Sequence, residues 1–156
     1  MTLSYYLFHK LWEAEQKTAM LYEKLENKVK DPELRKFFAD LKEDEYYHAR
    51  LVENTKYLWK ELPDDSQASK NKMEEVEDFL NFIDETLRKI DAKEEVMRTE
   101  SLEIVYKIEV EMGEFHLLIM DRVEDPQLNK LLRALSSYDK IHVGKIKKKL
   151  EESGLI

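Results

Sequence analysis

The chain carries one sequence pattern twice, at a constant separation of 94 residues. Asp31-Pro32 recurs as Asp125-Pro126, and Leu41 recurs as Leu135. Aspartate followed by proline is typical of a helix start, because the carboxylate accepts hydrogen bonds from the first turn and proline suits the first helical position. Each copy therefore predicts a turn followed by a helix. Repetition on this scale indicates a single supersecondary unit that is used twice.

Apolar residues recur at helical spacing on both sides of each turn, which predicts two helical hairpins. We expect helices over 4–29, 32–61, 97–123 and 126–152, a shorter amphipathic helix over 73–90, and a polar loop over 62–71. The chain has only three Gly and three Pro and shows no strand-like alternation, which is typical of an all-α protein. We therefore predict one domain over residues 1–156, built from the hairpin 4–61, the crossover 62–96 and the hairpin 97–152.

Composition excludes several classes of function. The net charge of −8 argues against a nucleic-acid partner. The absence of cysteine excludes disulfides, thiolate metal sites and cysteine catalysis. The first residues lack the basic and apolar regions of a signal peptide, and no apolar run reaches membrane-spanning length. We therefore expect a cytoplasmic protein that does not associate with a membrane.

Six polar residues interrupt the apolar stripes of the four long helices: Glu15, Glu45, His48, Glu109, Asp139 and His142. The repeat relates the first three to the last three. Glu15 precedes the turn residue Asp31 by about as many residues as Glu45 follows it, so both lie roughly 21–24 Å from the turn at 1.5 Å per helical residue. Packing the two hairpins face to face would gather four carboxylates and two imidazoles in the middle of a bundle.

Four buried carboxylates repel one another and lose their hydration, so they require compensation. Two divalent cations would neutralise them, and carboxylate oxygens with imidazole nitrogens suit iron, manganese or zinc. We predict that the six residues bind two metal ions per chain, most simply iron. The alternative is a metal-free hydrogen-bonded network. Tyr22 and His116 match each other two turns beyond the glutamates of their helices, too far to bind metal, and are either hydrogen-bond donors to the ligands or polar core residues.

This arrangement resembles the ferritin-like di-iron and di-manganese carboxylate proteins and is most similar to their rubrerythrin-type members. The resemblance covers residues of both hairpins, about 5–60 and 99–150. It implies a four-helix bundle of up-down-down-up topology, with a long crossover that contains a short extra helix. It also implies a role for each ligand, with Glu15 and Glu109 as terminal ligands, Glu45 and Asp139 as bridges, and His48 and His142 binding one metal each.

The chain departs from the rubrerythrin pattern in three ways. It has no cysteines for a rubredoxin domain, so electrons would come from a separate donor protein. Met112 occupies the place of an additional glutamate ligand, which weakens the inference of peroxidase activity. Asp139 is one methylene shorter than the expected glutamate, which affects the metal spacing or leaves one bridge as a terminal ligand.

The resemblance implies a non-haem di-iron oxidoreductase that acts on hydrogen peroxide or oxygen, with the metal centre itself performing the chemistry. Three alternatives stay open: a ferroxidase or iron-storage protein, a manganese protein with catalase-like activity, and a metal-free structural bundle. Iron storage would require a shell of many subunits. We expect a homo-oligomer with no nucleic-acid partner.

Overall fold

The computed structural model describes residues 2–62 and 70–156, with side chains from residue 73 onward in the second segment. Six helices form within them: α1 (Leu3–Lys28), α2 (Pro32–Glu53), α3 (Lys56–Glu61), α4 (Lys70–Asp91), α5 (Arg98–Met120) and α6 (Pro126–Glu152). No strand occurs in this part of the chain, which confirms the all-α class. Most of the expected polar loop, residues 63–69, lies outside the described residues. Its last two positions are wrong, because α4 already begins at Lys70.

The two Asp-Pro pairs start helices as predicted. The Asp31 carboxylate accepts a hydrogen bond from the backbone N–H of Glu33 at 3.0 Å, and Pro32 is the first residue of α2. Asp125 accepts hydrogen bonds from the first turn of α6 in the same way. These caps satisfy backbone donors that lack a partner within the helix, so they determine where each hairpin turns.

The expected single helix over 32–61 is interrupted, because the chain turns at Asn54 and Thr55 between α2 and α3. The Thr55 hydroxyl donates to the carbonyl oxygen of Val52 at 2.7 Å and accepts from the Trp59 indole at 3.0 Å. A threonine hydroxyl that bonds to nearby backbone competes with continuation of the helix. The turn lets α3 bury Trp59 against Phe8 of α1, with ring centroids 6.1 Å apart.

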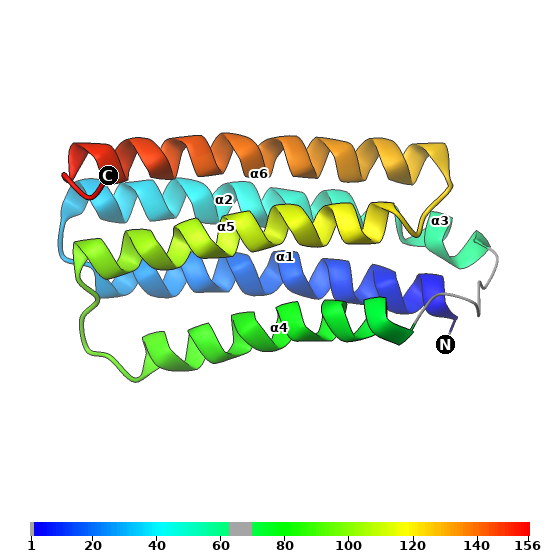
Figure 1. The fold of residues 1–156 in the computed structure, drawn as a ribbon, viewed down its shortest axis with the longest axis horizontal. Helices are drawn as coiled ribbons and strands as arrows, with labels where there is room; N and C mark the ends of the chain where they lie inside the picture. The colour runs from blue at the N-terminus through cyan, green and yellow to red at the C-terminus, as the bar shows by residue number, and fades with distance from the viewer. Residues whose placement is uncertain (1, 63–69) are drawn as a thin grey trace.

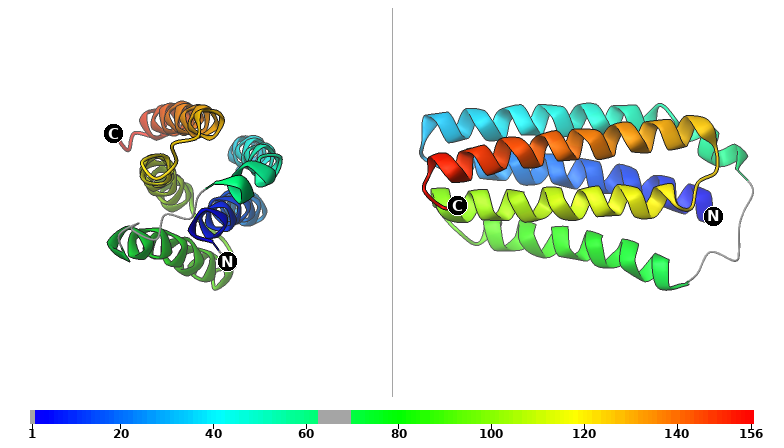
Figure 2. Two further views of the ribbon diagram at one scale, coloured as in Figure 1. Left: turned by 90° about the vertical axis from the view of Figure 1, so that its right-hand side faces the viewer. Right: turned by 45° about the horizontal axis from the view of Figure 1, so that its top comes forward.

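The long helices lie side by side in an elongated bundle (Figures 1 and 2). The helix α1 packs mainly against α2, and α5 packs mainly against α6. The helices α2 and α5 run in one direction, whereas α1, α4 and α6 run in the other (Figure 1). The helix α4 returns along most of the bundle and packs against α1 and α5. It confirms a helix over 73–90 in the crossover and begins three residues earlier and ends one residue later than expected.

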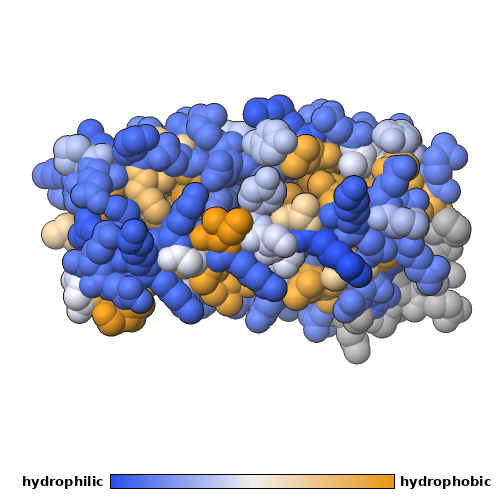
Figure 3. Space-filling model, turned by 90° about the horizontal axis from the view of Figure 1, so that it is seen from above, coloured by the Kyte–Doolittle hydropathy of each residue, from blue (hydrophilic) through white to orange (hydrophobic). Residues whose placement is uncertain are grey.

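The bundle core is apolar along most of its length, with leucine, isoleucine, valine and phenylalanine side chains almost fully buried. The surface around α6 is mostly hydrophilic and carries only separate hydrophobic groups (Figure 3). No described helix combines the length and the apolar character that crossing a bilayer requires. Burial of the apolar faces therefore holds the helices together.

Candidate metal centre

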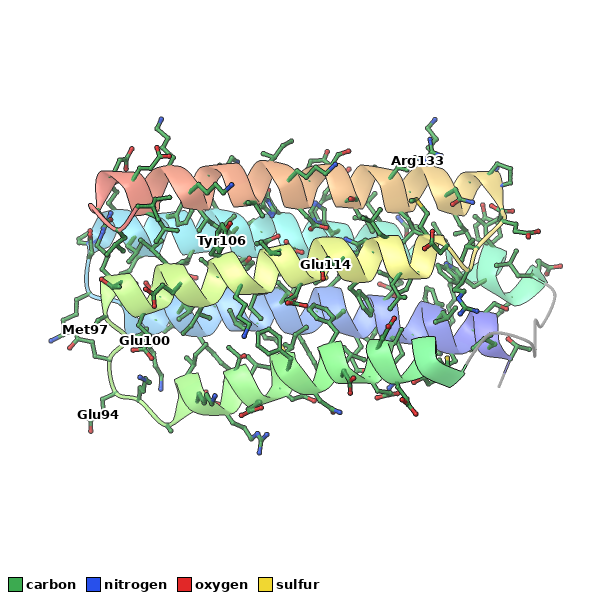
Figure 4. The ribbon with its side chains drawn as sticks, in the orientation of Figure 1. Glu94, Met97, Glu100, Tyr106, Glu114 and Arg133 are labelled. Carbon is green, nitrogen blue, oxygen red and sulfur yellow. The ribbon has the colours of Figure 1, made fainter. Side chains whose placement is uncertain are left out.

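A group of ionisable side chains lies inside the bundle, where charged residues are rare. Glu94 and Arg133 show the usual arrangement, since both are exposed and point away from the helices (Figure 4). The six predicted ligands are at most 1% exposed, and so are Tyr22 and His116. Their burial fits the prediction that these polar residues face the interior, and it requires that each finds a partner there.

The structure brings five of the six predicted ligands into two overlapping groups. Glu15, Glu45 and His48 each offer one ligand atom, and these atoms lie within 4.8 Å of one another. Glu45, Glu109 and His142 form a second group by the same measure. Glu45 belongs to both groups, so its carboxylate lies between two positions that could each hold a metal ion.

His142 presents its two ring nitrogens to different partners. Its Nδ1 lies 3.2 Å from Glu109 Oε1 and 3.3 Å from Glu45 Oε1, on the inner side. Its Nε2 lies 3.0 Å from Asp44 Oδ2, on the outer side. A carboxylate on the far nitrogen of a histidine fixes the ring orientation and the tautomer, and such an arrangement commonly supports metal-binding histidines.

Sequence reasoning missed Asp44, although a signal was present. The repeat relates Asp44 to Tyr138, and the two residues occupy equivalent places around the histidines. Asp44 of α2 contacts His142 of α6, and Tyr138 of α6 lies against the ring of His48 with centroids 4.8 Å apart. A search for side chains that contact the histidines from one position before each acid of the pattern would have identified both residues.

Tyr22 and His116 contact the predicted ligands, which is the first of the two roles considered for them. The Tyr22 hydroxyl donates a hydrogen bond to Glu109 Oε1. His116 Nε2 lies 2.5 Å from Glu15 Oε1. Because α1 and α5 run in opposite directions, two turns onward from either glutamate leads toward the glutamate of the other helix (Figure 1).

Asp139 belongs to neither group of potential ligands. Its Oδ2 lies 2.5 Å from His116 Nδ1, so His116 connects Glu15 of α1 with Asp139 of α6. The expected bridging position therefore differs between the two halves of the repeat. Glu45 reaches the centre between the two groups, whereas the shorter Asp139 side chain contacts the His116 imidazole.

Burial and nearby charges divide the three glutamates of the centre into two kinds. Burial raises the pKa of Glu15 to about 8, with His116 opposing the shift and the Glu45 charge adding to it. Burial and the Glu45 charge likewise raise the pKa of Glu109 to about 8. Burial alone would also raise the pKa of Glu45, but the neighbouring His142 and His48 imidazoles outweigh it and hold that pKa well below its usual range. Without metal, Glu45 is thus the ionised acid at the centre.

The imidazoles respond to the same charges in the opposite sense. Burial would lower the pKa of His142, but the Glu109 and Glu45 carboxylates raise it to about 11. Asp139 and Glu15 overcome burial and raise the pKa of His116 well above its usual range. Glu45 similarly raises the pKa of His48. In the metal-free centre, the raised pKa values therefore favour protonation of the potential ligands. These ligands would have to lose those protons to bind a metal.

The unpaired atoms of the centre fit a bound cation. Each acid has one buried oxygen without a hydrogen-bond partner in the described part of the chain: Glu15 Oε2, Glu45 Oε1, Glu109 Oε2 and Asp139 Oδ1. Glu45 Oε1 faces His142 Nδ1 but lacks hydrogen-bond geometry. Buried carboxylate oxygens without partners are costly, and metal ions held by the two groups would satisfy those of the three glutamates. Oxygen and imidazole donors together suit iron, manganese and zinc.

Comparison of the chain with protein-family models, with curated proteins and with solved structures gives no match. The buried Glu and His groups define a centre that could hold a metal ion inside an all-helical bundle.

Proposed function

We propose that the protein is a ferritin-like, dinuclear metal-carboxylate protein that acts as an oxidoreductase on hydrogen peroxide or oxygen. The observation that carries this proposal is the pair of three-residue groups that share Glu45. One carboxylate with ligand atoms on both sides is suited to bridge two ions, and the repeat supplies one histidine and one further glutamate to each ion. Two iron ions would supply electrons to the oxidant. A separate donor protein would then reduce the iron again.

The residues of the chain hold the centre and control access to it. Glu15 and Glu109 would each bind one ion, and Asp44 orients the His142 ring through its outer nitrogen. Complete burial excludes bulk water and strengthens every charge interaction at the site. A groove of about 290 Å³ lies between α2 and α6 and is lined partly by Asp44. The complete burial of the centre favours a small oxidant over a large organic substrate.

Metal content and rapid mixing test the proposal. The protein should bind two ferrous ions per chain, and the loaded protein should be oxidised by peroxide or oxygen faster than free ferrous ion. Steady turnover should require an added electron donor. Glu45→Gln should remove binding of both ions, because Glu45 is shared. Glu43→Gln, on the exposed face of the same helix, is the matched control and should bind as the wild type does.

The measurements also separate the alternative functions. A native mass of many subunits with a growing ferric mineral would indicate iron storage instead of an oxidoreductase. Manganese in protein from the native host, with peroxide dismutation, would indicate a catalase-like protein. Fewer than one tightly bound ion per chain at saturation would refute the metal centre and leave a structural bundle.

A further inference from the structure

Tyr22 and His116 occupy equivalent places in the repeat and support opposite glutamates. Tyr22 on α1 holds Glu109 of α5, and His116 on α5 holds Glu15 of α1. Each potential metal position therefore includes one glutamate that is oriented by a residue of the other helix.

His116 differs from its repeat partner Tyr22 because its ring has a second nitrogen that makes a further contact. A tyrosine hydroxyl reaches only one glutamate, whereas the imidazole lies 2.5 Å from Glu15 on one side and 2.5 Å from Asp139 on the other. Glu45, the repeat partner of Asp139, instead faces the histidines at the centre. The residue at position 116 thus gives the two acids different surroundings.

Close packing of α6 on α5 places Asp139 beside His116. A β-carbon built on Gly113 would lie 3.8 Å from Asp139 Cβ and 4.0 Å from Asp139 Oδ2. The Asp139 side chain is therefore in near contact with α5, one turn before His116. If Asp139 used Oδ2 for a metal, His116 Nδ1 would lose its buried partner, which is unfavourable. Neither Oδ2 nor the unpaired Oδ1 of Asp139 belongs to one of the two groups of potential ligands.

We propose that Asp139 is not a metal ligand but the anchor of His116, and that His116 positions Glu15 for the metal beside His48. Tyr22 positions Glu109 in the same way for the metal beside His142. The inference rests on the proposed two-metal centre. It assigns the support of each metal position to a different residue and leaves Glu45 as the one bridging carboxylate.

Counting bound ions tests the role of Asp139. Asp139→Asn should still bind two Zn²⁺ per chain by equilibrium dialysis, whereas Glu45→Gln should lose both. A count of one ion for Asp139→Asn beside two for the wild type would overturn the inference and leave the proposed metal centre standing. A wild-type chain that binds no zinc would overturn both.

Site-resolved zinc titration tests the positioning role. Imidazole ¹⁵N signals of His48 and His142 report the two positions separately. His116→Phe should weaken zinc binding at His48 by about 10–100-fold, the usual effect of removing a partner of a ligand, and leave binding at His142 within about twofold. Tyr22→Phe should do the reverse. His116→Gln keeps a donor to Glu15 and should restore part of the loss.

General destabilisation of the fold would weaken zinc binding at both histidines. It would not make His116→Phe act at His48 and Tyr22→Phe act at His142. Equal weakening at both histidines in both variants, or unchanged binding in His116→Phe, would overturn the positioning role. If His116→Phe fails to fold, Asp139→Asn gives the same test through the anchor, since it should weaken binding at His48 alone.

Discussion

Metal-free protein should lose stability as the pH rises from 5 to 7, because two buried acids keep their protons only in the folded chain. Burial raises the pKa of Glu15 and Glu109 to about 8, against 4.5 for an ordinary glutamate. Between these values the folded state binds one more proton per acid, and one unit corresponds to about 1.4 kcal/mol. Together the two acids should lower the free energy of unfolding by on the order of 5 kcal/mol, a large part of the stability of a domain.

The other groups act in known directions. His48, His116 and His142 have raised pKa values, so their stabilisation is complete below about pH 6.5 and is lost as the pH rises. Glu45 has a lowered pKa, so its stabilisation is present above its ordinary pKa and is lost as the pH falls below it. Stability of the metal-free protein should therefore be greatest near about pH 5.

Urea unfolding in the presence of a chelator at pH 5, 6 and 7 measures the effect. The double variant Glu15→Gln/Glu109→Gln carries no titrating group at these positions. Its free energy of unfolding should therefore fall less steeply with pH, with a slope smaller by the contribution of about two protons. Glu43→Gln/Glu114→Gln makes the same substitutions at two exposed positions and is the control. A wild-type stability that is constant or rises from pH 5 to 7, or equal slopes for wild type and variant, would refute the reasoning.

Three further outcomes follow from the same contacts. Zinc should raise the melting temperature more at pH 7.5 than at pH 5.5, because binding displaces protons; a constant increment in thermal melts would contradict this. Asp44→Asn should weaken zinc binding at His142 by about 10–100-fold in a site-resolved titration, whereas Asp40→Asn, exposed one turn earlier, should not. Thr55→Val should lower the free energy of urea unfolding by about 1 kcal/mol, since the buried Trp59 indole loses its acceptor; an unchanged value would exclude that role.

Much of the fold could be read from the sequence, because its signals are local or repeated. Asp31-Pro32 and Asp125-Pro126 specify helix starts through their own side chains, and the structure places both helices accordingly. The break at Thr55 was missed because apolar spacing continues through it. Its cause includes a contact between Trp59 and Phe8, residues far apart in the chain.

The candidate site was partly predictable for a similar reason. A repeat shows which residues are equivalent, and it therefore pointed to Glu45 and His48 in the interior. It could not show that equivalent residues make different contacts. Asp139 departs from Glu45 because its side chain is shorter and because His116 offers a second nitrogen, and both effects depend on the packing of α6 on α5.

Charge balance explains how such a centre could exist both with and without metal. Without metal, raised pKa values of about 8 keep Glu15 and Glu109 neutral at pH 7, and the raised pKa values of His116 and His142 favour their charged forms around the ionised Glu45. Binding of two divalent ions would remove about four protons, from the two glutamic acids and the two ligand histidines. Four positive charges would then enter as about four leave, with His116 remaining between Glu15 and Asp139. The exchange keeps the buried net charge nearly constant, so the bundle avoids the cost of an uncompensated charge in either state.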